Sequence, residues 1–526
     1  MHYEFILSFF FVLLGGMFLS TDDFHMLQQN SYFNSRYLKW FSKNADRYVI
    51  RLAWICIILI SFAIRTFELN IVGCVVTAIY MLWAILGVVK RQKKAIKPLV
   101  FTNRVIRMYV TAGVLLVASF VLAALCFKTT DLSVLPLMIL AVETPIIVLL
   151  ANLLNAPIEA FFRNRFIKDA KRILKSCKEL KTIGITGSFG KTSTKFILAR
   201  ILEEKFNLTY TPASFNTPMG VVRTVRENLK PSDKLFICEM GAKNIGDIKE
   251  ICDIVYPDVA VISSVGPQHL ETFKTVDNVA KTKFELADAV ALKGGKVYVN
   301  FDSQPAREYA ANYQNVVSYG STEDCDIRVS NVKCSRNGVE FDVEYNTSSL
   351  HLTSKMLGIH NVLNIAGAVG IALDFGVSEN DIKYAVNHLK AVEHRLEMKP
   401  FINGAILVDD AYNANPTGSA EAVNVLASFE GMTRIIVTPG LVELGDDEYE
   451  CNKRLGALAA QKIDHVVLVG VERAKPLAEG AKEAGIADDR LHIVPTFKDA
   501  MALLHTMTDS NSVVLFENDL PDNYAK

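Results

Sequence analysis

The sequence lacks an excess of charge of either sign, because 56 Lys and Arg residues balance 56 Asp and Glu residues among its 526 residues. The resulting net charge of zero says nothing about a nucleic-acid partner, and we expect none. The nine cysteines show no paired spacing, which favours free thiols in a reducing compartment. Internal repeats and low-complexity linkers are also missing. The chain is nevertheless too long for one ordinary domain.

Apolar residues are concentrated before residue 155. A helix that spans a bilayer needs about 20 mainly apolar residues, and five stretches approach this length: 5–20, 49–67, 71–89, 109–127 and 132–154. Residues 1–154 are therefore predicted to form a membrane domain of about five transmembrane helices. The alternative is that these are buried helices of a soluble protein.

The loops predict an orientation for these helices. Residues 90–107 carry seven Lys or Arg residues and no acidic residue, and basic residues also precede residue 49 and follow residue 160. Basic loops stay in the cytoplasm. We therefore expect a multi-pass cell-membrane protein whose catalytic domains lie in the bacterial cytoplasm. Residues 155–180 form an amphipathic juxtamembrane helix, which either lies on anionic lipid or packs on the next domain.

From residue 181 onward, short apolar strands alternate with helical stretches. "TIGIT", "KLFICEM" and "DVAVISSV" are continuous apolar runs, as expected when helices cover both faces of a sheet. After about residue 324 the pattern changes to alternation, which predicts a small antiparallel ribbon. A second open α/β sheet begins near residue 396. These patterns predict two α/β domains, residues 181–395 and 396–526.

The stretch "TGSFGKTSTK", residues 186–195, has the composition of a phosphate-binding loop between a strand and a helix. In such loops the backbone N–H groups hold the anion, a lysine adds charge, and a Ser or Thr hydroxyl binds magnesium. The pattern is shorter than usual, since Ile185 stands where the first glycine is expected and Gly187 supplies the turn.

Further strings downstream contain candidate functional residues. Glu239 and His269 each follow a predicted strand, and Lys283 comes fourteen residues after His269. A carboxylate at the end of a strand can bind magnesium, whereas a lone histidine is more often structural. "GIHNVLN" contains Asn361, "EHRLE" contains Arg395, and "VDDAYNANP" contains Asp410, Asn413 and Asn415.

In their order and spacing these motifs resemble the Mur ligases, and the resemblance covers residues 181 to about 520. The family joins an amino acid or peptide to a carboxylate with ATP. The resemblance implies a P-loop-type central ATPase domain and a Rossmann-like C-terminal domain. It also implies that a substrate carboxylate attacks the γ-phosphate of ATP, and that an amine then attacks the resulting acyl phosphate.

The resemblance also implies a role for each matched residue. Lys191, His269 and Lys283 would be catalytic. Thr192 and Glu239 would bind one magnesium ion, and His269 with a carbamylated Lys283 would bind a second. The expected ATP-binding residues are Gly187, Ser188, Gly190, Lys191, Thr192, Ser193, Asn300, Asn361, Arg395 and Asp410. The expected substrate contacts are Asn216, Thr217, Asn413 and Asn415.

The chain departs from the family at three places that concern the substrates. The domain that holds a uridine nucleotide in soluble members has no counterpart before the phosphate loop. The ending "LFENDLPDNY" replaces a basic Lys-Gly-Ser-Arg-type ending, and Ala411 stands where Thr or Ser is usual. These differences leave ATP chemistry intact and leave the acceptor open.

Three classes of function follow. The first is an ATP-dependent amide ligase of cell-wall peptide synthesis, of the D-alanyl-D-alanine-adding type, whose acceptor is a cell-wall precursor. Within it, a lipid-linked or polyglutamate-type acceptor is the alternative, with the substrate held at the lipid bilayer. The second is an ATP-driven membrane transporter, although the sequence has no "LSGGQ"-like signature. The third is a non-catalytic membrane scaffold.

Overall fold

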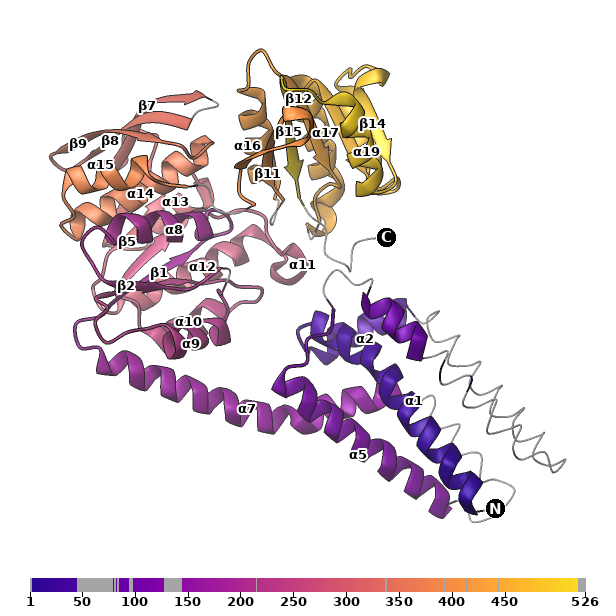
Figure 1. Ribbon diagram of the computed structural model, residues 1–526. Helices are drawn as coiled ribbons and strands as arrows, with labels where there is room; N and C mark the ends of the chain where they lie inside the picture. The colour runs from indigo at the N-terminus through magenta and orange to yellow at the C-terminus, as the bar shows by residue number, and fades with distance from the viewer. Residues whose placement is uncertain are drawn as a thin grey trace. The chain divides into compact units, whose positions relative to one another are not determined.

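The computed structural model describes residues 2–44, 79, 82, 85–93, 98–126, 144–213, 215–335, 338–390, 394–411, 415–442 and 444–518. The chain forms two compact units, Met1–Arg165 and Phe166–Lys526. The first unit is helical in its described part, and the second contains two β-sheets (Figure 1).

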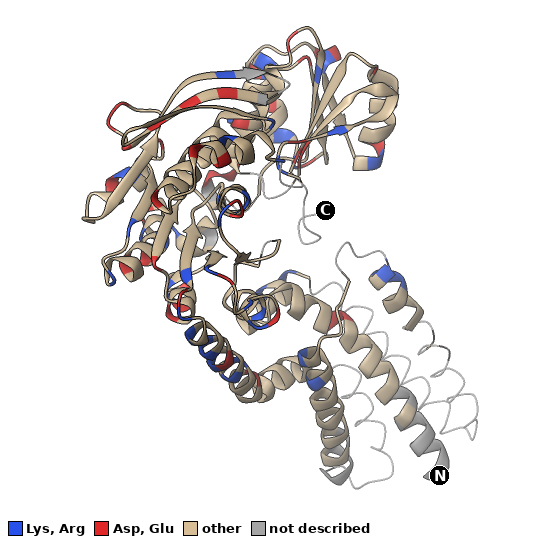
Figure 2. Ribbon diagram, turned by 60° about the vertical axis from the view of Figure 1, so that its left-hand side comes forward, with Lys and Arg blue, Asp and Glu red and all other residues tan. Residues whose placement is uncertain are grey.

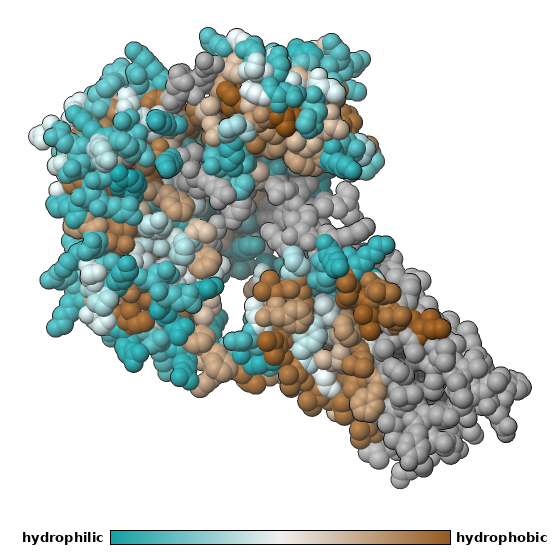
Figure 3. Space-filling view, in the orientation of Figure 1, coloured by the Kyte–Doolittle hydropathy of each residue, from teal (hydrophilic) through white to brown (hydrophobic). Residues whose placement is uncertain are grey.

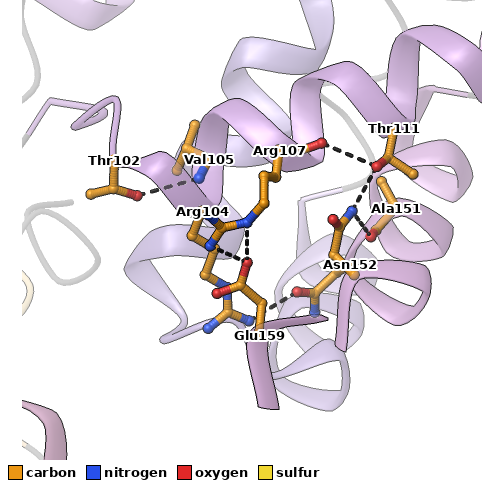
Figure 4. A network of polar contacts seen from close by, with 9 residues as sticks. Thr102, Arg104, Val105, Arg107, Thr111, Ala151, Asn152 and Glu159 are labelled. Atoms are coloured by element: carbon orange, nitrogen blue, oxygen red, sulfur yellow. Dashed lines mark hydrogen bonds and ion pairs between the residues drawn. The ribbon is translucent and has the colours of Figure 1, made fainter. Parts of the chain in front are cut away.

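The helices of the first unit are α1 (His2–Gln29), α2 (Asn34–Lys43), α5 (Asn103–Cys126) and the first part of α7 (Thr144–Ser176). Polar side chains join them. Arg107 donates to Oε1 of Glu159 across α5 and α7 at 2.8 Å, and Arg104 donates to Oδ1 of Asn152 at 3.1 Å (Figure 4). Apolar side chains stand exposed along the same helices (Figure 3), among them Phe18, Val114 and Leu153.

The predicted multi-pass membrane location is wrong. Within the described residues, one helix, α7, is long and apolar enough to cross a membrane, and 33% of its apolar stretch is buried in the protein. Three of the predicted stretches fall largely into the gaps in the described residues. Stretch 49–67, most of stretch 71–89, and residues 132–143 of stretch 132–154 lie outside the described residues. Hydropathy alone does not distinguish a lipid-facing helix from one that packs on protein. Stretch 5–20, for example, continues within α1 to Asp22 and Asp23, which pair with Arg91 and Tyr37.

The second half of α7 packs on the α/β fold, which is the second of the two alternatives for the amphipathic helix. Phe166, Ala170 and Leu174 belong to a core cluster of the second unit. Asp169 receives a hydrogen bond from Arg226 at 2.9 Å. Lys and Arg residues recur along this part of the helix (Figure 2). Helix α7 runs without interruption through Pro157 from the fifth apolar stretch into this region.

The central sheet has nine strands in the order β2-β3-β1-β4-β5-β6-β7-β8-β9. Strands β1 to β7 run parallel to one another. Strand β8 is antiparallel to both β7 and β9. The predicted ribbon is therefore present, but it extends the central sheet. The strands are β1 (Lys181–Thr186), β2 (Leu208–Tyr210), β3 (Leu235–Glu239), β4 (Val259–Ile262), β5 (Val297–Asn300), β6 (Val316–Gly320), β7 (Ile327–Ser335), β8 (Gly338–Tyr345) and β9 (Ser348–Ser354).

Helices cover both faces of this sheet, as the continuous apolar strands predict. Alternate residues of one strand point to opposite faces, so Ile237 packs with α8 and α14, whereas Phe236 packs with α9, α10 and α12. The helices are α8 (Lys191–Leu202), α9 (Pro218–Glu227), α10 (Asp247–Val255), α11 (Leu270–Phe273), α12 (Val276–Ala291), α13 (Gln304–Ala310), α14 (Ile359–Asp374) and α15 (Glu379–Asn387).

The second sheet has six strands in the order β10-β11-β15-β12-β13-β14, and only β10 is antiparallel to its neighbour. This confirms the predicted second α/β sheet. Its strands are β10 (Glu397–Pro400), β11 (Ile406–Asp410), β12 (Thr433–Thr438), β13 (His465–Val469), β14 (Leu491–Val494) and β15 (Ser512–Glu517). Its helices are α16 (Pro416–Ala427), α17 (Glu448–Lys462), α18 (Lys475–Glu483) and α19 (Phe497–Met507), with short 3-10 turns Ile402–Gly404, Gly445–Asp447 and Asp488–Arg490.

Candidate active site

The loop between β1 and α8 is shaped by two glycines that no other residue can replace without strain. Gly187 has φ 152° and Gly190 has φ 76°, both in the region that favours glycine. A Cβ on Gly187 would stand 2.2 Å from the hydroxyl of Ser263, and one on Gly190 would stand 2.9 Å from Oδ1 of Asn364. Backbone and neighbours therefore hold this loop tightly at the N-terminus of α8, where an anion is favoured.

The segment that follows β4 holds the loop from the adjacent strand. The backbone N–H of Ser188 donates to the carbonyl of Ser264 at 2.7 Å. The Ser188 hydroxyl donates to the carbonyl of Gly266 at 3.0 Å, and the Ser264 hydroxyl accepts from the N–H of Phe189 at 3.2 Å. Sequence reasoning missed this support. The signal was present, since "SSVG" follows a strand that a doubly wound sheet can place beside β1.

Lys191 lies at the start of α8 and folds back over the loop. Its ammonium donates to the carbonyls of Gly187 at 2.7 Å and Ser188 at 3.1 Å. Burial lowers the pKa of Lys191 to about 8, nearby Glu239 opposes this shift, and Arg395 lowers the pKa further. The lysine predicted to hold the phosphates is therefore present in the loop, but in this structure it is bonded to the loop itself.

Glu239 gathers the polar side chains at the carboxyl ends of β1 and β3. These strands are neighbours, with Ile185 opposite Glu239. Oε1 of Glu239 accepts from the Thr192 hydroxyl at 3.1 Å and from Nδ2 of Asn216 at 3.1 Å. Oε2 faces Lys195 at 3.0 Å. The predicted pair Thr192 and Glu239 is thus brought together, and Asn216, predicted as a substrate contact, lies against the same carboxylate.

His269 and Lys283 come from different elements. His269 precedes α11 with a positive φ of 51°, and Lys283 lies on α12 with an exposed fraction of 1%. Burial, assisted by Lys191, lowers the pKa of Lys283 well below its ordinary value. Among the described residues, no three His, Cys, Asp or Glu side chains gather closely enough to hold a metal ion. A second ion would therefore need an additional anionic ligand.

The N-terminal half of α14 lies beside the loop. Nδ2 of Asn361 donates to the carbonyl of Leu357 at 2.6 Å, and its Oδ1 is buried without a hydrogen-bond partner. Asn364 accepts from the hydroxyl of Thr194 at 3.1 Å. Asn361 was predicted as a nucleotide contact. Asn364 was not given a role, although its spacing of three residues on the same helix places it on the same face.

The second sheet contributes two neighbouring carboxyl groups, of which Glu517 is buried and Asp410 is half-buried. Asp410 and Glu517 stand opposite each other at the ends of the parallel strands β11 and β15. The Ser419 hydroxyl donates to Oε1 of Glu517 at 2.6 Å, and the N–H of Leu396 donates to Oδ1 of Asp410 at 3.1 Å. Burial raises the pKa of Asp410 to about 6, against the effect of Arg395. Burial and Asp410 raise the pKa of Glu517.

The other predicted residues make local contacts. Asn300 accepts from the N–H of Asp302 at 2.9 Å, Thr217 caps α9, and Asn415 caps α16 by accepting from Gly418. Ser193 is buried in the first turn of α8. Asn413 lies outside the described residues. None of these contacts joins the residue to the phosphate loop.

The family models match both sheets. The Mur ligase middle domain matches residues 185–372, and the Mur ligase glutamate ligase domain matches residues 394–517. Together they cover more than half of the chain, and the loop, Thr192 and Glu239 lie inside the first. The chain therefore belongs to the Mur ligase family, whose members are ATP-dependent enzymes that form a C–N bond. A membrane transporter and a non-catalytic scaffold gain no support from these matches.

Within the family, the chain is similar to D-alanyl-D-alanine-adding ligases. It is 28% identical over 339 residues to the UDP-N-acetylmuramoyl-tripeptide–D-alanyl-D-alanine ligase of Bacillus subtilis, covering 64% of this chain and 72% of the relative. It is 30% identical over 298 residues to the Escherichia coli enzyme of the same name, covering 55% of this chain and 64% of the relative. The structure of MurF from Acinetobacter baumannii covers 69% of this chain and 78% of its own, with a TM-score of 0.62 and 27% identity. The structure of MurF from Thermotoga maritima in complex with ADP matches with a TM-score of 0.61 and 26% identity. The match covers 69% of this chain and 81% of that chain.

Proposed function

We propose that this protein is a D-alanyl-D-alanine-adding ligase of cell-wall peptide synthesis, which activates a peptide carboxylate with ATP and joins it to the amine of a dipeptide. The observation that carries the proposal is the position of Glu239, whose Oε1 meets the Thr192 hydroxyl directly behind the phosphate loop. We further propose that residues 181–395 form the ATP-binding domain and residues 396–526 the domain that closes over it.

The residues around Glu239 fit a magnesium ion. Magnesium prefers oxygen ligands and is commonly held by one or two carboxylates together with substrate phosphates. Thr192 and Glu239 supply a hydroxyl and a carboxylate at one place, at the end of a loop suited to phosphate. When bound, the ion would neutralise charge that develops on the phosphoryl oxygens.

Lys283 fits the expected second metal site only after modification. An ammonium beside a metal ion would repel it, but burial favours the neutral amine of Lys283. A neutral amine adds to carbon dioxide and, by losing a proton, becomes a carbamate anion. We propose that this carbamate and His269 hold a second magnesium ion. The carbamate would supply the additional anionic ligand that the described acidic residues do not.

The remaining residues would bind and orient ATP. Gly187 and Ser188 would shape the loop, the N–H groups from Gly190 to Ser193 would donate to the phosphates, and Lys191 would turn from the loop carbonyls to them. The unpartnered Oδ1 of Asn361 can accept a hydrogen bond from the nucleotide, and Asn300 would lie nearby. Arg395 and Asp410 would approach from the second sheet. Closure of that domain would keep water from the acyl phosphate.

The acceptor is proposed from the names of the relatives, which give a uridine-linked muramoyl tripeptide and D-alanyl-D-alanine. The test is an assay of ATP hydrolysis and product mass by the purified chain, with this tripeptide as acceptor and a panel of amino acids and dipeptides as amines. The lipid-linked and polyglutamate-type carboxylates expected from the sequence serve as comparison acceptors. A product that contains D-alanyl-D-alanine on the tripeptide supports the proposal. ADP formation that no amine accelerates would contradict it.

A further inference from the structure

Lys195, one turn after Lys191 in α8, has a position that phosphate binding does not explain. Its side chain is 0% exposed and that of Glu239 is 1% exposed, and Nζ lies 3.0 Å from Oε2 of Glu239. The same ammonium donates to the carbonyl of Ala213 at 2.5 Å. A buried ammonium is costly unless it is paired, and its paired partner here is the carboxylate that also contacts Thr192.

The two oxygens of Glu239 are therefore divided between two tasks. Oε2 faces Lys195, whereas Oε1 faces the hydroxyl of Thr192 and the amide of Asn216. Oε1 is thus the oxygen that contacts Thr192, the proposed magnesium ligand beside the phosphate loop. The pair Lys195 and Glu239 has no net charge, so the site offers a divalent ion one oxygen and little Coulomb attraction until phosphates arrive.

We infer that Lys195 is a positioning residue that holds Glu239 as a single-oxygen ligand and makes magnesium binding depend on the nucleotide. The inference rests on the proposed ATP-dependent function. Without Lys195, Glu239 would be a buried, unpaired anion, free to turn both oxygens toward a cation. Such a carboxylate would attract a divalent ion in the absence of ATP.

The test is Lys195→Met, which removes the charge and keeps most of the volume. We measure Mn²⁺ binding by electron paramagnetic resonance, first with Mn²⁺ alone and then with Mn²⁺ and ADP. The wild-type protein should bind Mn²⁺ tightly only with ADP. The variant should bind Mn²⁺ alone at least about tenfold more tightly than the wild type, because the repulsion by a nearby unit charge is gone. Lys205→Met, which removes an exposed ammonium that donates to Gly376, is the matched control and should leave Mn²⁺ binding unchanged.

A second set of variants separates the charge from simple packing and covers the case in which Lys195→Met does not fold. Lys195→Gln keeps a donor toward Glu239, and Lys195→Met with Glu239→Gln removes both charges. Thermal unfolding should show that the double variant regains stability that Lys195→Met loses. It should also show that Mg²⁺ alone raises the Tm of Lys195→Gln and not that of the wild type or the double variant.

Two results would overturn the inference: unchanged affinity for Mn²⁺ alone in a folded Lys195 variant, or failure of Glu239→Gln to restore stability. Neither result depends on which acceptor the enzyme uses. The proposed ligase function could therefore fail in the product assay while Mn²⁺ binding still behaves as expected. Equally, the product assay could succeed while the Mn²⁺ measurements contradict the role of Lys195.

Discussion

Asn364 packs its side-chain amide against the backbone of Gly190, so that a Cβ on this glycine would stand 2.9 Å from Oδ1 of Asn364. The N-terminal half of α14, which carries Asn364, therefore limits the shape of the phosphate loop. Two separate features therefore require glycine at position 190: its positive φ and the lack of room for a side chain beside Asn364.

Gly190→Ala should raise the KM for ATP at least about tenfold, because the loop must move away from Asn364 or adopt another φ. A non-glycine residue at positive φ costs roughly 1–2 kcal/mol. Gly431→Ala is the matched control, since Gly431 has φ 74° with nothing within 4 Å of its Cβ position. It should lose similar stability and keep its KM. Equal KM values in the two variants would show that Asn364 does not constrain the loop.

Lys191 should make ATP binding dependent on pH. Its pKa is about 8 in the nucleotide-free protein, so the charged form that attracts phosphate is lost as the pH rises through 8. The kcat/KM for ATP, which reports the free enzyme, should fall about tenfold per pH unit above that value. Calorimetry near pH 8.5 in buffers of different ionisation enthalpy should show proton uptake on ATP binding. Lys191→Ala should lose turnover by roughly a thousandfold, and near-normal turnover would contradict its assigned role.

Lys283 should be carbamylated, which ¹³C NMR of protein equilibrated with ¹³CO₂ can detect directly. Lys283→Ala should be nearly inactive, and short added carboxylates should restore part of the activity by supplying the missing anion. Lys281→Ala, on the exposed side of the same helix, is the control and should behave as the wild type. Full activity in Lys283→Arg, which cannot form the carbamate, would show that no carbamate is needed.

Glu517→Gln should stabilise the protein at high pH. The pKa values of Glu517 and Asp410 are raised in the folded state, so the folded protein holds these protons more tightly than the unfolded chain. This stabilisation is complete below about pH 4 and is lost as the pH rises through about 6 for Asp410. The variant relieves the repulsion and keeps an acceptor for Ser419.

Chemical denaturation at several pH values checks this. The variant should match the wild type within roughly 0.5 kcal/mol near pH 5 and exceed it by about 1–3 kcal/mol near pH 8. Glu430→Gln, an exposed position in the same sheet domain, should show no such trend. A difference of the same size at both pH values would mean that the two carboxyl groups do not interact.

The sequence predicted the parts of the site that depend on local order. The phosphate loop was predictable because a strand, two glycines, Lys191 and Thr192 follow one another, and Glu239 because it ends an apolar strand. Ser264 and Glu517 were not predicted, since their positions depend on which strands become neighbours, and Asn364 was given no role. Strand β4 brings Ser264 to the loop and β15 brings Glu517 to Asp410. Similarly, alternation predicted the antiparallel ribbon, but only the pairing of β6 with β7 joins it to the central sheet.

The membrane prediction failed for a related reason. A run of apolar residues shows how apolar a helix is as a whole. It does not show whether the helix contacts lipid or other parts of the protein. The pairing of Asp22 with Arg91 and of Arg107 with Glu159 joins residues that are distant in sequence, so no hydropathy window contains it.

The bracing of the phosphate loop by Ser263, Ser264 and Gly266 has a consequence for the interpretation of genetic data. A screen for variants that fail to use ATP would recover substitutions at these positions together with those at Lys191 and Thr192. Their phenotype would look like the loss of a ligand contact. Suppressor variants would distinguish the two groups. A second substitution in the loop can restore a lost contact between the loop and the segment after β4, whereas it cannot restore a lost contact with phosphate.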